Sequence, residues 1–197
     1  MTKVTVKTKK VSKQAIIKEW QDFYLKYFGL TIDLSGVKIP RLRKGYDRVI
    51  IIAQGLTCNE TLEALRKLFN VYTSYVNDDL GKAISSNSRD TTSSYAIRVK
   101  DSIEPDQEYF GKSADEADPQ GNLGVTLLER LVLELKYFVE TDQHLDVEGR
   151  TLCTGSRVFA GAAVPDVDWN PHYRRLGVDY DSFVCVFARR GLRSVVL

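Results

Sequence analysis

The sequence predicts an α+β protein with three helices, a mixed sheet and a C-terminal part rich in β-strands. Capping residues followed by apolar positions at helical spacing begin near Ser12, Thr57 and Thr126. In the segment 48–53, Arg48 is followed by uninterrupted, mostly β-branched apolar residues, which predicts a buried strand, and residues 95–99 predict a further strand. After Gly149, short alternating stretches are separated by turn residues, which is typical of a small sheet.

The N-terminal segment predicts a strand or arm and then a helix. Residues 2–11 alternate valine with threonine and lysine, so we expect an edge strand or an extended arm there. Ser12 is expected to cap a helix whose apolar face includes Ile16 and Trp20 and which ends at Gly29.

A basic loop at 40–45 precedes the strand at 48–53. Thr57 and Glu60 then match the capping-box pattern of a second helix. Cys58 lies in the first turn, where the helix dipole favours a thiolate, so a nucleophile is one interpretation. A buried or incidental cysteine is the preferred interpretation, because no histidine is near in the sequence.

Two segments between these elements favour loops. Residues 77–94 are rich in Ser, Asn, Asp and Thr, and residues 104–124 form an acidic stretch interrupted by proline and glycine. We expect the second to be a solvated loop or flap, because its carboxylates lack the spacing of a calcium loop. The helix that opens at Thr126 is expected to place Glu129 and Glu134 on its polar side.

The composition changes after Glu148. The chain holds 14 Lys, 10 Glu and 6 Gln, and none of them follows that residue, whereas seven Arg and four Asp do. The net charge is −1 over residues 1–148 and +3 over residues 149–197. We therefore divide the chain into a scaffold part, 1–148, and a β-rich display part, 149–197, within one compact unit.

Four strands are expected in the display part, at 152–158, at 164–170, around Leu176 and at 183–188. Alternation predicts that Val167, Trp169, Val184 and Val186 point inward. The polar and aromatic residues between them are expected to face outward as ligand-binding residues: Asp166, Asp168, Asn170, His172, Tyr173, Arg174, Arg175, Asp179, Tyr180, Asp181, Phe183 and Phe187.

A catalytic or metal site is not expected in this part. His172 could act as a base with Asp166 or Asp168, but no nucleophile stands in a recognisable elbow. The two aspartates supply only part of a coordination sphere. Three cysteines without a CxxC pair also disfavour a zinc site or a disulfide framework. We expect neither an enzyme nor a cofactor.

The residue types after residue 163 match a particular mode of diversification. Replacing adenines in an asparagine codon yields many residue types but never Lys, Glu, Gln, Met or Trp, and the final 34 residues contain none of these five except Trp169. Together with Gly155-Ser156-Arg157, the run 164–169 and the closing run 191–196, this resembles the variable region of proteins diversified by diversity-generating retroelements. The resemblance implies a C-type-lectin-like fold in the last quarter of the chain, used for binding.

The sequence thus favours non-enzymatic recognition of a protein or other macromolecular ligand. The alternative is a nucleic-acid-binding accessory protein that uses basic clusters around 41–44, 174–175 and 189–190. No apolar run is long enough to cross a bilayer and no leader is recognised, so we expect a cytoplasmic protein without a membrane partner.

Overall fold

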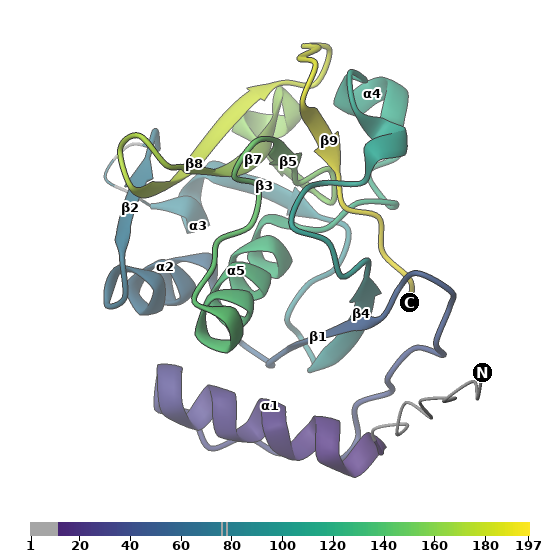
Figure 1. Cartoon of the computed structure of the whole chain (residues 1–197), viewed down its shortest axis with the longest axis vertical. Helices are drawn as coiled ribbons and strands as arrows, with labels where there is room; N and C mark the ends of the chain where they lie inside the picture. The colour runs from purple at the N-terminus through teal and green to yellow at the C-terminus, as the bar shows by residue number, and fades with distance from the viewer. Residues whose placement is uncertain (1–11, 76, 78) are drawn as a thin grey trace, which may run out of the picture. The chain divides into compact units, whose positions relative to one another are not determined.

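The computed structural model describes residues 12–75, 77 and 79–197. It confirms an α+β fold, with helices and a mixed sheet (Figure 1). The chain forms two compact units, Met1–Gly36 and Val37–Leu197, so the segment 149–197 lies within the second unit together with most of the scaffold part. The arm or strand expected at 2–11 lies outside the described residues.

The first unit is built around helix α1, Lys13–Phe28. The Ser12 hydroxyl accepts a hydrogen bond from the Ala15 amide, and Gly29 ends the helix in a left-handed conformation, as the sequence predicts. Trp20, Phe23 and Tyr24 lie on one side of the helix, with ring centroids 5.1 to 6.0 Å apart. The aromatic positions at helical spacing therefore serve packing.

The second unit contains the remaining helices and all nine strands of the described chain (Figure 1). Its helices are α2 Cys58–Arg66, α3 Leu80–Ala83, α4 Ala114–Ala117 and α5 Leu127–Thr141. Its strands are β1 Arg48–Ile52, β2 Asn70–Thr73, β3 Ile84–Asn87, β4 Tyr95–Val99, β5 Arg150–Leu152, β6 Ser156–Val158, β7 Ala163–Asn170, β8 Arg175–Ser182 and β9 Arg190–Leu192. The capping boxes of Thr57 and Thr126 are both present, which confirms the predicted starts of α2 and α5.

Seven strands form one mixed sheet whose main path runs β2-β8-β7-β5-β9. β2 is parallel to β8, β9 is parallel to β5, and the long hairpin β7–β8 is antiparallel. Strand β6 pairs with β7 and with β3, whereas β1 and β4 form a separate antiparallel pair. The hairpin is thus held in the middle of the sheet, with partner strands on both sides.

Three predictions about local structure are wrong. The segment 77–94 contains α3 and β3, and the stretch 152–158 is two strands, β5 and β6, separated by a turn. The stretch 183–188 is a loop: Val184 and Val186 are 60% and 53% exposed, not inward. Alternation alone suggested a strand there, but no neighbouring strand pairs with this segment in the described chain.

The acidic stretch 104–124 is also not a solvated loop. It contains α4, whose own capping box joins Ser113 and Glu116, and it buries Asp106 and Asp118. The Asp118 carboxylate accepts hydrogen bonds from the amides of Asn122, Leu123 and Gly124 and from the Thr154 hydroxyl. These carboxylates therefore organise the backbone instead of facing water.

Candidate functional site

The β7–β8 hairpin carries most of the residues that the sequence marks as ligand-binding. Its register places Asp166 opposite Asp179, Asp168 opposite Gly177 and Val167 opposite Val178. Residues directly opposite each other share a face of the sheet. One face therefore carries four aspartates, Asp166, Asp168, Asp179 and Asp181, and the other carries Val167, Trp169, Leu176 and Val178.

The aspartate face is an ion-pair network and not a free surface. Arg150 of β5 lies 2.9 Å from Asp166, 3.1 Å from Asp168 and 3.7 Å from Asp179. Arg190 of β9 lies 3.1 Å from Asp166 and 2.7 Å from Asp181. The prediction that Asp166 faces outward is therefore wrong, because it is fully buried between two arginines.

Burial dominates the electrostatics of this face. It raises the pKa of Asp166 to about 6, although Arg150 and Arg190 act in the opposite direction. Burial also raises the pKa of Asp168. Burial would raise the pKa of Asp181 as well, but the hydrogen bond from Arg190 brings it below its usual value. Four carboxylates thus share two guanidinium groups on this face, and Asp166, the most deeply buried of them, has its pKa raised by the loss of hydration.

The opposite face of the hairpin packs against α5. Val167, Leu176 and Val178 are fully buried, and Trp169 is half-buried. The Trp169 ring stacks on His144 with 3.3 Å between centroids, and Phe69 contacts both rings edge-on. The inward positions predicted for Val167 and Trp169 agree with this arrangement.

The turn at 171–174 forms one end of the hairpin. His172, Tyr173 and Arg174 are exposed there, and Asn170 accepts a hydrogen bond from the Tyr173 amide. Arg174 has a left-handed conformation with φ of 48°. Arg175 at the start of β8 lies 4.2 Å from the centre of the Tyr72 ring and 4.8 Å from that of Tyr173.

The other end of the hairpin is apolar. We call it the aromatic end and define it by its exposed large apolar residues: Phe159, Tyr180, Phe183, Val184, Val186 and Phe187. The rings of Phe159 and Tyr180 are 4.5 Å apart, and Tyr75 stacks against Phe159. Phe187 lies over the Arg190 guanidinium at 4.1 Å. The loop that follows β8 and the turn that precedes β7 meet here, because Ala163 pairs with Ser182.

Apart from the aspartates, the exposed members of the predicted set are divided between the two ends of the hairpin. Strand β8 advances about 3.3 Å per residue, so its two ends are about 23 Å apart. His172, Tyr173 and Arg174 lie at the turn, whereas Tyr180, Phe183 and Phe187 lie at the aromatic end. One small ligand cannot contact both ends at once.

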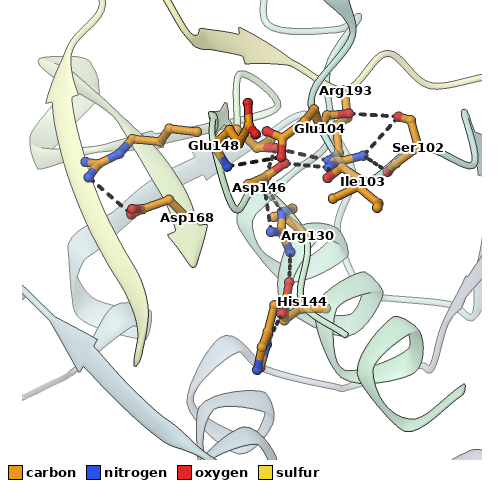
Figure 2. A network of polar contacts seen from close by, with 12 residues as sticks. Ser102, Ile103, Glu104, Arg130, His144, Asp146, Glu148, Asp168 and Arg193 are labelled. Carbon is orange, nitrogen blue, oxygen red and sulfur yellow. Dashed lines mark hydrogen bonds and ion pairs between the residues drawn. The ribbon is translucent and has the colours of Figure 1, made fainter. Parts of the chain in front are cut away.

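A buried chain of charged side chains lies behind the hairpin, and sequence reasoning missed it (Figure 2). Asp146 accepts hydrogen bonds from Arg130, Arg193 and Thr151. Arg130 also donates to Glu134 at 2.8 Å, and Glu134 lies 2.9 Å from His144 Nδ1. Arg130, Glu134 and Asp146 have no exposed area.

This buried chain of charged side chains connects four distant parts of the sequence. Arg193 donates to the carbonyl oxygens of Ser102 and Ile103 as well as to Asp146 (Figure 2). The burial of Glu129 and Glu134 contradicts their expected place on a solvated side of α5. Glu129 instead binds Arg89 and accepts a hydrogen bond from Tyr95. The signal in the sequence is Leu133, an apolar and buried residue that falls between charged positions on this side of α5.

The basic residues that the nucleic-acid alternative would use are only partly available to a ligand. Arg41, Arg43 and Lys44 are exposed, as is Arg174. Arg189 forms an ion pair with Glu148, and Arg190 is buried in the aspartate network. The cluster expected at 189–190 therefore offers little free positive charge.

Two of the three cysteines lie in the interior, whereas Cys185 lies in the loop of the aromatic end, between Val184 and Val186. Cys58 and Cys153 are buried, and burial raises the pKa of the Cys58 thiol to about 12 and that of Cys153 as well. The buried interpretation of Cys58 is confirmed, and its thiol is not an activated nucleophile. Within the described ranges, no three His, Cys, Asp or Glu side chains are grouped as metal ligands.

The described helices include none that is both long and apolar enough to cross a membrane. Comparison of the chain with family models, with curated proteins and with solved structures found no match.

Proposed function

We propose that this chain is a non-enzymatic recognition protein that binds a protein or other macromolecular ligand through its aromatic end. The observation that carries the proposal is the exposure of six large apolar side chains at one end of a hairpin whose strands are paired on both sides. Aromatic and aliphatic anchors of this kind supply most of the energy at protein interfaces.

The sheet beneath the aromatic end is rigidly braced, which supports a binding role. Arg150 and Arg190 tie β5 and β9 to the aspartates of β7 and β8. A preorganised surface loses less conformational entropy on binding than a mobile one. Lysine and glutamate, which are among the residues that lose the most rotamer freedom when ordered, are absent from this part of the chain.

The backbone at Phe159 and Ala160 adds a second argument. Both residues adopt left-handed conformations, with φ of 51° and 56°, and neither is a glycine. Such conformations cost about 1 to 3 kcal/mol and persist where the surrounding structure holds them. Here the strained turn directs Phe159 outward, where it meets Tyr180.

A binding test compares the two ends of the hairpin. The triple variant Phe183→Ala, Val184→Ala and Val186→Ala removes part of the aromatic end, and Tyr173→Ala is the matched control at the turn. Partners captured by the wild-type protein are purified, and their affinities for all three proteins are measured directly. We expect the triple variant to bind at least about 30-fold more weakly and the control to bind normally.

Circular dichroism and thermal melting of both variants establish that they are folded. Equal affinity of the folded triple variant and the wild-type protein for every captured partner would refute the role of the aromatic end. Loss of binding by Tyr173→Ala alone would move the site to the turn.

We further propose that this surface belongs to a protein diversified by a retroelement, with a C-type-lectin-like C-terminal part. The residue types after 163 support this, because the exposed positions at both ends of the hairpin fall within the set reachable from asparagine codons. The encoding DNA should then lie near a reverse transcriptase gene and a near-copy of its own 3′ end that differs only at adenines. Absence of that near-copy from the genome would remove this part of the proposal and leave the binding role to its own test.

A further inference from the structure

A polar pocket of about 220 Å³ lies away from the hairpin, where three segments of the second unit meet. Its lining comes from the end of β3, from the loop after α4 and from the turn between β5 and β6. Ser86, Ser88, Asn122 and Arg157 contribute polar side chains, and no aspartate or glutamate lines it. This volume is large enough for several water molecules or a small ligand.

Arg157 is the only charged residue in this lining. Its Nη1 donates to the carbonyl oxygens of Thr154 and Ser156, which fixes the guanidinium at the pocket. Within the described part of the chain, no carboxylate lies within ion-pair distance of Arg157. Arg130, Arg150, Arg190 and Arg193, in contrast, all pair with aspartates.

The glycines of the pocket keep the guanidinium accessible. A side chain at Gly121 would begin 3.0 Å from Arg157 Nη2, and one at Gly155 would begin 2.9 Å from the Ser88 hydroxyl. Asp118, which lies beneath Thr154, is buried, and its oxygens already accept four hydrogen bonds. The groups that remain available in the lining are the guanidinium of Arg157, hydroxyls and carboxamides. They offer a ligand a positive charge and hydrogen-bond donors, with no carboxylate to oppose a negative charge.

We propose that this pocket binds a small organic oxyanion that also carries hydroxyl groups, of the sugar-phosphate type. Arg157 would hold the oxyanion through charge-assisted hydrogen bonds, which are stronger than those between neutral groups. The hydroxyls of Ser86 and Ser88 and the carboxamide of Asn122 would meet the hydroxyl groups of the ligand. This site is independent of the aromatic end.

The test titrates the wild-type protein with glucose 6-phosphate, inorganic phosphate and glucose and follows amide and arginine Nε–H signals by NMR. We expect shifts at Arg157, Ser86 and Asn122, with glucose 6-phosphate binding more tightly than phosphate and glucose binding weakest. Arg157→Gln should weaken binding of glucose 6-phosphate about tenfold or more. Arg174→Gln removes an exposed charge outside the pocket and should leave binding unchanged.

The titration of the wild-type protein tests whether the pocket binds the anion, even if Arg157→Gln does not fold. Lack of shifts at the pocket residues with both anions would overturn the proposal. So would equal binding of glucose and glucose 6-phosphate, because the charge would then not be recognised. Unaltered affinity of a folded Arg157→Gln variant would exclude Arg157 as the anchoring residue and also overturn it.

Discussion

Replacing Asp146 by asparagine should destabilise the second unit more than any exposed change of charge. Asp146 is fully buried and binds both Arg130 and Arg193, whose side chains are 0% and 1% exposed. In Asp146→Asn, Arg130 keeps Glu134 as its counter-charge. Arg193 keeps only the Thr151 hydroxyl and the oxygens of Ser102 and Ile103 within the described structure.

The expected loss in the free energy of unfolding arises because the buried guanidinium of Arg193 is left without a carboxylate. Removing one partner of a buried ion pair costs about 3 to 5 kcal/mol. For a unit the size of Val37–Leu197, this corresponds to a fall of roughly 10 °C in melting temperature. Chemical and thermal unfolding, followed by circular dichroism, measure both quantities.

Asp101→Asn is the matched control. Asp101 also pairs with an arginine, Arg48, at 2.7 Å, but its side chain is 50% exposed. Arg48 retains Glu140, so the control should lose at most about 1 kcal/mol. If Asp146→Asn loses no more than Asp101→Asn, the buried chain does not stabilise the fold in the way described.

Three further predictions concern the aspartate network, a close contact and the alternative function. The pKa of Asp166 is raised to about 6 in the folded protein, so the folded state binds the proton of this carboxyl more tightly than the unfolded state does. The resulting stabilisation of the folded protein is present at low pH and is lost as the pH rises through 6. The free energy of unfolding of the wild-type protein relative to Asp166→Asn should therefore fall by about 1 kcal/mol between pH 5 and pH 7, and a pH-independent difference would contradict this. Gly124→Ala should cost about 1 to 3 kcal/mol in unfolding measurements, because its Cβ would lie 2.0 Å from Thr154 Oγ1, whereas Gly36→Ala, which meets nothing within 4 Å, should be nearly neutral or slightly stabilising. If the nucleic-acid alternative holds, DNA or RNA is retained in filter binding at low salt and lost steeply as salt is added; no retention at low salt eliminates it.

The sequence predicts the helix starts well because their signals are local. Ser12, Thr57 and Thr126 each form a hydrogen bond with an amide three residues away, so the residues that decide the cap lie together in the chain. The strands at β1, β4, β7 and β8 follow for a similar reason, since apolar residues mark them directly. Local chemistry is enough for these elements.

The interior of the second unit could not be predicted in the same way. Arg130 and Glu134 look like solvated helix residues, and their burial depends on Asp146 and on Arg193, which lies 63 positions beyond Arg130. The loop after Ser182 shows the opposite error. Its alternation resembles a strand, but a strand exists only where a partner is available.

The predicted site was limited in the same way, because contacts between distant strands cannot be read from the sequence. Alternation placed Asp166 and Asp168 correctly on the face opposite Val167 and Trp169. It could not show that Arg150 and Arg190 cover this face, because both come from other strands. Tyr173, Tyr180, Phe183 and Phe187 belong to the predicted set, whereas the exposed Phe159 does not. The separation of these residues into two ends required the register of β7 and β8.

The order of strands in the sheet has a consequence for the speed of folding. Strand β2 pairs with β8 about a hundred residues further along the chain, and β5 pairs with β9 in parallel. Such distant pairings carry a large loop-closure entropy and make folding slow. The hairpin β7–β8 needs only a four-residue turn, so it can form first and act as the template on which the distant strands assemble. Substitutions of exposed side chains at the two ends of this hairpin leave its backbone pairing unchanged, so they would have little effect on this early step of folding.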